Sequence, residues 1–417
     1  MRREYPEPLI ALLVFILGVW VWDHYLGNSE GYAPGTEQIA LLKIERDLQI
    51  SEAMGSKAPW IGDLAGIPDP QVVRRRAISA LSDLASEKSI TSTGNVAFEI
   101  VNSLQNGTAM PSRESLLTSR LGDWWHFKWM QATSPALDES KGEIFNAHGQ
   151  KLVGRVLASR LAVGILAMLG LLCVPWAIKE LKSIRARRDE NYGDRWGISL
   201  GLTVFLVVIL ASLGFGMTLD LGISLLPGLP PGMGIALGAT ASMLPALMAL
   251  GLLFRRPGHA TRVLGINRPV HLMPVLSLFT LLLIFDQLFD LLTGNIRASE
   301  PGGGLSLGDA GGLGLVSIIV LSCIVAPISE EILYRGVLFR SLSNRLGFLY
   351  AATASSVVFA ILHLYNGYGL LSVGLFGFCC ATLYHFTRSL SAVILLHVLY
   401  NSTIKIPEWF IYHAPLS

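Results

Sequence analysis

The stretch Leu313–Arg340 reads LGLVSIIVLSCIVAPISEEILYRGVLFR, and its two halves need different surroundings. The first half is apolar enough to lie in a lipid bilayer. The second half adds two adjacent carboxylates, Glu330 and Glu331, and then Arg335. Because an ionisable side chain at mid-membrane costs on the order of 2.5–3.5 kcal/mol, such residues are usually functional, paired or both. The stretch therefore predicts a membrane helix that carries a polar site.

The whole chain has the composition of a membrane protein. Of its 417 residues, 52% are hydrophobic and only 15% are charged, with a mean hydropathy of +0.51. Soluble domains carry about 25% charged residues. The apolar residues recur in blocks of about 20, the length that crosses a bilayer as a helix. We therefore predict an all-α, polytopic transmembrane helix bundle, and the net charge of +2 gives no indication of nucleic-acid binding.

The apolar blocks predict about nine spans. We interpret the first, at about 8–23, as a retained helix, because it ends in VWVWDHY and not in the small-residue cleavage site of a signal peptide. The other blocks lie at about 156–178, 198–219, 231–254, 271–292, 312–334, 348–365, 369–386 and 389–405.

A polar segment, residues 27–152, separates the first two spans. In EQIALLKIERDL and PQVVRRRAISALSDLASE, apolar residues recur every three or four positions, as on one face of a helix. At the start of the second run, DPQ is typical of an N-cap (Asp69) followed by Pro at the first helical position (Pro70). We expect a small, mainly helical extramembrane domain inserted after the first helix, 1–26. Residues 153–190 then supply the second span and a basic loop, and 191–417 the core bundle.

Loop charges orient the predicted spans. Four connections are rich in Lys and Arg: 179–188, 255–262, 335–345 and the turn at Arg388. The alternate loops, 220–232 and 298–312, are nearly free of both residue types. By the positive-inside rule we expect the basic loops in the cytoplasm, with the amino terminus inside and the 27–152 domain outside.

The first polar cluster is the motif SEEILYR. On a helix, Glu331 and Arg335 lie four residues apart on one face and can form an ion pair. Glu330 points about 100° away from that face. Burial without a cationic partner makes a carboxylate a better proton acceptor, so Glu330 is a candidate general base. A structural ion cluster at a helix end accounts for the same residues.

Two further polar clusters follow within about 70 residues. Phe359 and His363 of FAILH share a helical face, and so do His397 and Asn401 of HVLYN. A lone histidine in an apolar helix is more often a core residue than a catalyst. His397 and Asn401 can stabilise a developing oxyanion, or join two helices by a hydrogen bond.

The order EExxxR, FxxxH and HxxxN, within residues 310–405, resembles the CPBP family. This family includes the type II CAAX prenyl endopeptidases and bacterial bacteriocin-processing and immunity proteins, and all three motifs match without departure. The resemblance implies an intramembrane endopeptidase in which Glu330 and His363 activate a water molecule on a peptide carbonyl. It also implies an oxyanion site made by His397 and Asn401. The resemblance also implies supporting roles for Glu331, Arg335 and Phe359.

The metal requirement of such an enzyme is a separate question. The chain has no HExxH, the usual zinc signature of a helix. Asn401 fits an oxyanion site better than a zinc site, so we favour a metal-free, glutamate-type mechanism. If zinc were bound, Glu330, His363 and His397 would be its three protein ligands.

Two other functions stay open on the sequence. A non-catalytic scaffold or immunity-type protein is expected to have lost a motif residue, and none is lost here. A proton-coupled transporter would use Glu330 and the histidines as a relay, with support from Asp220, Asp286 and Asp290, although we see no inverted repeat.

For the favoured function we expect a membrane-associated protein or peptide as the substrate, within the lipid bilayer. The outward domain favours a bacterial cytoplasmic-membrane enzyme acting on a secreted or membrane-anchored peptide. A prenylated protein is the eukaryotic precedent in the family. The sequence does not indicate the oligomeric state.

One difficulty concerns depth. If spans 312–334 and 348–365 were straight, Glu330 would lie near the cytoplasmic side and His363 near the outer side. They can meet only if the connection lies partly in the membrane plane or a helix is short, tilted or broken. Gly336 and Gly347 bracket that connection and favour a break.

Overall fold

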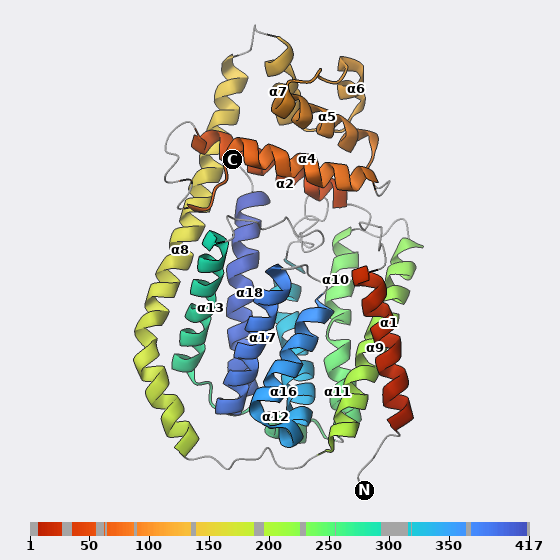
Figure 1. Ribbon diagram of the computed structural model, residues 1–417, viewed down its shortest axis with the longest axis vertical. Coiled ribbons are helices and arrows are strands. Elements are labelled where there is room, and N and C mark those ends of the chain that lie inside the picture. Colours follow the sequence, from red (N-terminus) through yellow and green to blue (C-terminus); the bar gives the residue numbers. More distant parts are fainter. Residues whose placement is uncertain are drawn as a thin grey trace. The chain divides into compact units, whose positions relative to one another are not determined.

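The computed structural model describes residues 7–26, 36–55, 62, 65–86, 90–134, 139–186, 196–225, 231–254, 256–292, 316–317, 319–363 and 368–414. These residues form helices joined by turns and short loops, and none of them lies in a strand, which confirms the all-α prediction (Figure 1). The chain divides into two compact units. One comprises residues 1–29, 164–287 and 309–406, and the other 30–163, 288–308 and 407–417.

The second of these units is a small helical domain. Its helices are α2 (Thr36–Gly55), α4 (Pro70–Ser86), α5 (Ser92–Asn106), α6 (Arg113–Thr118), α7 (Asp123–Thr133) and the part of α8 (Glu139–Ala186) up to residue 163. The expected cap of α4 is present, because Asp69 Oδ1 accepts a hydrogen bond from the Gln71 amide at 2.8 Å. Its core is built from side chains that recur at helical spacing, with Leu48, Ile100 and Trp125 almost fully buried.

The end of the chain also belongs to this domain, a feature that the sequence did not suggest. The last turns of α18 (Leu390–Tyr412) follow Pro407, which lies inside the helix. Arg155 of α8 donates to the carbonyls of Phe410 and Ala414 at 3.1 and 2.8 Å. Tyr412 Oη donates to Asp47 Oδ1 at 2.7 Å. Burial raises the pKa of the Asp47 carboxyl.

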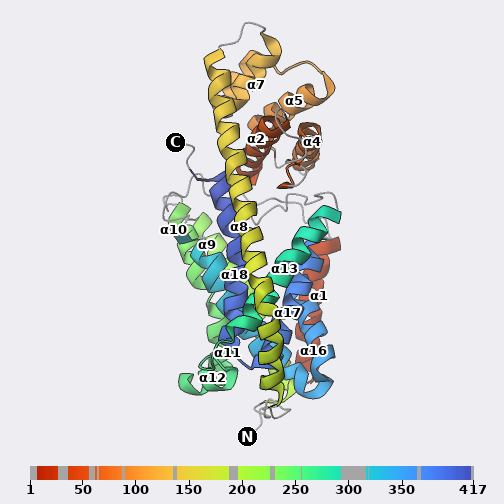
Figure 2. The same cartoon turned by 90° about the vertical axis from the view of Figure 1, so that its left-hand side faces the viewer.

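The first unit contains the apolar helices. They are α1 (Glu7–Leu26), α9 (Ile198–Ser224), α10 (Pro231–Ala241), α11 (Leu244–Leu253), α12 (Pro257–Leu264), α13 (Leu272–Leu292), α15 (Ala326–Glu331), α16 (Arg340–Leu362), α17 (Tyr368–Thr387) and most of α18, with π-helical turns at Leu321–Val325 and Ile332–Phe339. Figure 2 turns the view and shows that most of the long helices keep a common direction. The rest of α8, from residue 164, also belongs to this unit, and its Met168 and Leu172 side chains are exposed by 69% and 65%, as expected for surfaces that face lipid.

Among the described residues, six helical segments are long and apolar enough to cross a membrane: Lys141–Ile184, Ile198–Leu219, Leu272–Phe289, Leu321–Leu362, Gly369–Thr387 and Leu390–Tyr412. Two shorter apolar helices are Leu9–Trp20 and Leu244–Leu253. The predicted polytopic bundle is therefore confirmed. The count of about nine spans stays a prediction, and within it block 231–254 is split into α10 and α11 by a turn at Ser242 and Met243.

The predicted basic loop 335–345 is wrong, because these residues are helical. Arg335 and Arg340 are buried, at 1% and 5% exposure. Arg340 donates to the carbonyl of Val263 and lies over the Trp196 ring at 5.2 Å. Since both charges find partners inside the protein, the helix does not need to end at them.

The helix breaks at Gly347, which is one of the two glycines at which the sequence predicts a break. Its φ of 76° lies in the left-handed region, which a residue with a Cβ rarely adopts. Glu330 lies 17 positions before Gly347, and His363 lies 16 positions after it. The two arms therefore contain nearly equal numbers of residues. They fold back on one another, so that Glu330 Oε2 lies 3.7 Å from His363 Nε2.

Close helix contacts in this unit depend on small residues. A Cβ at Gly170 of α8 would overlap the Thr280 hydroxyl of α13, and one at Gly201 of α9 would overlap the Ser341 side chain of α16. Such contacts are typical of membrane bundles, where packing and not the hydrophobic effect drives helix association.

Candidate active site

The expected ion pair between Glu331 and Arg335 is present and buried. Glu331 Oε1 accepts a hydrogen bond from Arg335 Nη1 at 2.9 Å, and the two side chains are 0% and 1% exposed. Arg335 Nη2 also donates to the Gly377 carbonyl of α17 at 3.0 Å. The guanidinium lies 4.5 Å from the centre of the Phe359 ring, which adds a cation–π contact. Arg335 therefore joins three segments of the bundle.

Gly377 is the residue that allows this approach. A Cβ there would lie 3.2 Å from Phe359, 3.3 Å from Arg335 Nη2 and 3.3 Å from the Ser356 backbone. A larger residue would force the guanidinium or the Phe359 ring to move.

His397 is held by the same carboxylate. Its Nδ1 is 2.7 Å from Glu331 Oε1, and the residue is 3% exposed. The ring meets Phe376 edge to face at 4.7 Å, and Phe376 stacks on Tyr400 at 4.7 Å. A carboxylate on Nδ1 orients an imidazole so that Nε2 points to the opposite side.

His363 is oriented by the backbone at the end of α16. Its Nδ1 is 2.7 Å from the Phe359 carbonyl. Because a carbonyl only accepts hydrogen bonds, Nδ1 carries the hydrogen. The Phe359 ring packs against the imidazole at 4.3 Å, as expected from the FxxxH spacing.

The two oriented histidines face Glu330. Its Oε2 lies 3.7 Å from His363 Nε2 and 3.8 Å from His397 Nε2. Among the described residues, this buried oxygen has no hydrogen-bond partner. Both separations are longer than a direct hydrogen bond. One carboxylate oxygen and two imidazole nitrogens thus surround one point, while Glu331 lies on the far side of His397.

Asn401 lies on the same helix as His397 but has a different neighbour. Its Nδ2 donates to the Ser322 carbonyl at 2.8 Å, in the π-helical turn before α15. An amide nitrogen has two hydrogens, so one donor remains for another partner. Its role in an oxyanion site stays a prediction.

Asp286 forms a polar group that the motifs did not include. Its two oxygens accept hydrogen bonds from Tyr400 Oη at 2.6 Å and Ser372 Oγ at 2.9 Å. An aspartate inside an apolar block was the sequence signal for it. The side chains of Asp220 and Asp290 lie outside what the structure describes.

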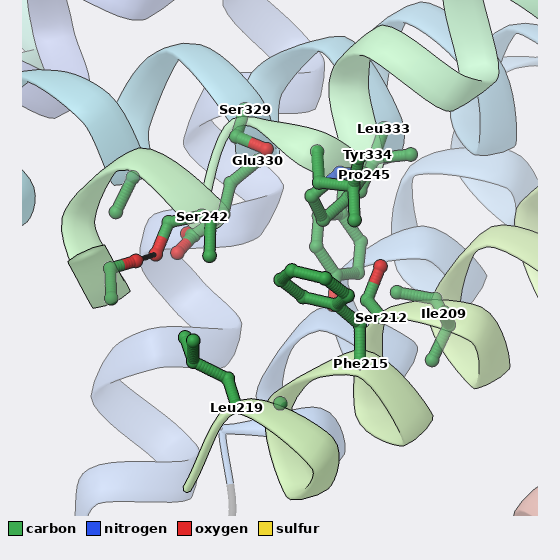
Figure 3. Close-up of a pocket in the computed structure, with 15 residues that line it drawn as sticks. Ile209, Ser212, Phe215, Leu219, Ser242, Pro245, Ser329, Glu330, Leu333 and Tyr334 are labelled. Carbon is green, nitrogen blue, oxygen red and sulfur yellow. Dashed lines mark hydrogen bonds between the residues drawn. The ribbon is translucent and has the colours of Figure 1, made fainter. Parts of the chain in front are cut away.

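A cavity of about 390 Å³ opens beside Glu330 (Figure 3). Its walls come from α9, from the end of α10 and the start of α11, and from the Ala326–Tyr334 stretch. Figure 3 shows side chains from all three walls directed into it. Sequence reasoning missed the contribution of α9 and α10, because the family motifs begin only after residue 310.

The described residues offer no group of three or more His, Cys, Asp or Glu with the spacing of a metal site. Zinc needs its ligands about 2.0–2.2 Å away, which places neighbouring ligand atoms within about 3.4 Å of each other in a tetrahedron. The separations of 3.7 and 3.8 Å around Glu330 are wider. The metal-free mechanism stays a prediction.

Comparisons with known proteins point to the same region. Residues 312–403 match the family model described as type II CAAX prenyl endopeptidase Rce1-like. The resemblance to CPBP proteases that the three motifs predicted is therefore confirmed for this region. A Bacillus subtilis (strain 168) protein named "Putative membrane peptidase YdiL" is 36% identical over 91 residues. That match covers 22% of this chain and 37% of the relative's length. No solved structure matches the chain significantly.

Proposed function

We propose that this protein is an intramembrane endopeptidase that hydrolyses a peptide bond of a membrane-associated protein or peptide. The supporting observation is the convergence of Glu330 Oε2 with the Nε2 atoms of His363 and His397, beside a cavity in an apolar helix bundle. The family match over residues 312–403 supports the same reaction.

In the proposed mechanism, Glu330 is the general base. A water molecule about 2.8 Å from both Glu330 Oε2 and His363 Nε2 bridges two atoms 3.7 Å apart. Its oxygen attacks the peptide carbonyl carbon as one proton passes to Glu330. When the carbon–nitrogen bond breaks, Glu330 returns this proton to the leaving amine.

Hydrogen bonds from His397 and Asn401 stabilise the negative charge that develops on the carbonyl oxygen. The Nε2 atom of His397 faces the same point as Glu330 Oε2, 3.8 Å away, while Nδ1 is held by Glu331. The second hydrogen of the Asn401 amide completes the oxyanion site.

The test uses purified protein in liposomes with a pool of quenched fluorescent peptides, each with an apolar core of about 20 residues. Cleavage products are identified by mass spectrometry. We expect cuts inside the apolar core. The membrane proteome of cells with and without the active protein then identifies natural substrates. Absence of any cleavage, together with an unchanged proteome, would favour the scaffold hypothesis.

The proposed mechanism needs no metal, and this gives a first prediction. A strong chelator is expected to leave cleavage unchanged, and the purified protein is expected to contain less than one zinc per chain. A carboxylate base with a neighbouring histidine can activate water, and the oxyanion donors replace a Lewis acid. The measurements are cleavage rates after dialysis and elemental analysis. Inactivation by chelator that added zinc or cobalt reverses would assign Glu330, His363 and His397 as ligands.

We also propose the orientation predicted from loop charge, in a bacterial cytoplasmic membrane. With Arg335 and Arg340 buried, the proposal relies mainly on the basic segments 179–188 and 255–262. In a chain whose four free cysteines are replaced by serine, an impermeant maleimide added outside should label cysteine at Thr118. It should not label cysteine at Ser183 unless the membrane is permeabilised. Labelling at Ser183 in intact cells would reverse the orientation.

A further inference from the structure

The cavity beside Glu330 has mostly apolar walls with a few hydroxyl groups. On α9 it is lined by Ile209, Ser212, Phe215, Gly216 and Leu219. Opposite α9 lie Gly238 and Ser242, and the third wall includes Glu330. A volume of about 390 Å³ is within the range that binds small-molecule-sized groups. An apolar ligand segment of this size therefore fits next to the candidate base.

The hydroxyls of Ser212 and Ser242 are directed in a specific way. Ser212 Oγ donates to the Val208 carbonyl at 2.7 Å, and Ser242 Oγ donates to the Gly238 carbonyl at 2.9 Å. A hydroxyl has one hydrogen and two lone pairs. Because each hydrogen is used on a backbone carbonyl four residues earlier, each serine offers acceptor capacity to the cavity. These two positions therefore suit a ligand that brings hydrogen-bond donors.

A peptide must be extended around the bond that is cut, and this creates such donors. Its backbone N–H groups lose their helical partners. In an apolar environment each unsatisfied backbone group costs several kcal/mol. Serine acceptors on two facing walls can satisfy these groups while the apolar side chains of the segment contact Ile209, Phe215 and Leu219.

Two glycines keep the cavity open. A Cβ at Gly216 or Gly238 would meet no heavy atom within 4 Å. This differs from Gly170, Gly201 and Gly377, where a Cβ would collide with a neighbouring helix or side chain. Gly216 and Gly238 are therefore not needed for helix contact, and their effect is to leave space beside Glu330.

We propose that this cavity binds the substrate as an extended apolar segment next to the scissile bond, with Ser212 and Ser242 accepting its backbone N–H groups. This rests on the proposed endopeptidase function. Gly216 and Gly238 leave room for the side chains of the segment, which limits their size. None of these four residues belongs to the family motifs.

The first experiment fills the cavity in the intact protein. Gly216→Leu and Gly238→Leu are each expected to lower kcat/KM for the quenched apolar peptides by about 100-fold, because the scissile bond is displaced from the base. Gly214→Leu is the matched control, since it lies on the same helix, has equal free space around its Cβ and does not line the cavity. Melting curves should be similar for all three variants.

The second experiment removes the acceptors. Ser212→Ala and Ser242→Ala are each expected to lower kcat/KM by about 5- to 10-fold, the loss of one hydrogen bond of about 1–1.4 kcal/mol. Thr218→Val and Thr240→Val are the controls. Their hydroxyls also donate to carbonyls of their own helices, Gly214 and Leu237, but neither residue lines the cavity. Unchanged cleavage in both serine variants would show that Ser212 and Ser242 do not accept hydrogen bonds from the substrate.

A binding readout separates this inference from the proposed function. An apolar peptide that carries a diazirine leucine is photo-crosslinked to the Glu330→Gln protein, and the attachment point is mapped by mass spectrometry. Crosslinks to α9 that Gly216→Leu abolishes support the cavity as the binding site even if no peptide is ever cleaved. Normal cleavage by both Gly216→Leu and Gly238→Leu overturns the inference and leaves the endopeptidase proposal intact.

Discussion

Replacing Glu330 with glutamine is expected to lower the cleavage rate by about 10²–10⁴-fold while the protein stays folded. Glutamine keeps the size of the side chain and cannot accept a proton from water. Glu330 is also partly exposed to the cavity and has no ion pair as close as that of Glu331, so its loss should cost little stability. His363→Ala and His397→Ala are expected to be similarly inactive, because each removes an imidazole that faces the same point.

The measurement is the initial rate on the quenched apolar peptides, with thermal melting in detergent as the check on folding. Glu180→Gln is a suitable control. Glu180 contacts a histidine too, with His271 Nδ1 at 2.6 Å, but it lies outside the candidate site. A Glu330→Gln protein with the wild-type rate would show that another group activates the water.

Arg335→Ala is expected to produce the largest loss of stability, about 3–5 kcal/mol, together with loss of activity. The substitution leaves Glu331 buried and charged with no guanidinium partner. It also removes the donor to the Gly377 carbonyl and the contact with Phe359. We expect a clear fall in the melting temperature in detergent. A melting curve identical to that of the wild type would mean that the pair does not contribute to the fold.

A double variant separates stability from catalysis in this pair. Glu331→Leu with Arg335→Met removes both charges, which is often neutral or stabilising for a buried pair. Its melting temperature is expected to recover relative to Arg335→Ala. Its activity is not expected to recover, because His397 loses the carboxylate that orients its ring at 2.7 Å. Recovery of both properties would make the pair unnecessary for catalysis.

Local parts of the site could be predicted from the sequence. The Glu331–Arg335 contact depends only on four-residue spacing along a helix, and the same rule separated Glu330 from Glu331. The packing of Phe359 on His363 follows from the same spacing. The role of Gly347 could also be expected, since glycine tolerates a positive φ.

Other parts depend on tertiary contacts that a local pattern does not contain. Arg335 and Arg340 were interpreted as loop charges, because their partners at Gly377 and Val263 lie 42 and 77 positions away. The cavity combines α9, α10 and α15, which are far apart in the sequence. The Glu331 carboxylate contacts both Arg335 and His397, and His397 lies 66 positions further along the chain.

Because the chain folds back at Gly347, the lengths of the helical arms on its two sides must match for Glu330 to meet His363. Adding one residue to an α-helical part of either arm would rotate everything beyond it by about 100° and move it by about 1.5 Å relative to the other arm. His363 would then no longer face Glu330. Insertions and deletions between these two residues are therefore compatible with the site only at the break itself, or as compensating changes in both arms. In an alignment of related chains, the interval from each residue to the break would stay fixed, and within it Arg335 and Phe359 would be retained for their contacts with Glu331 and His363.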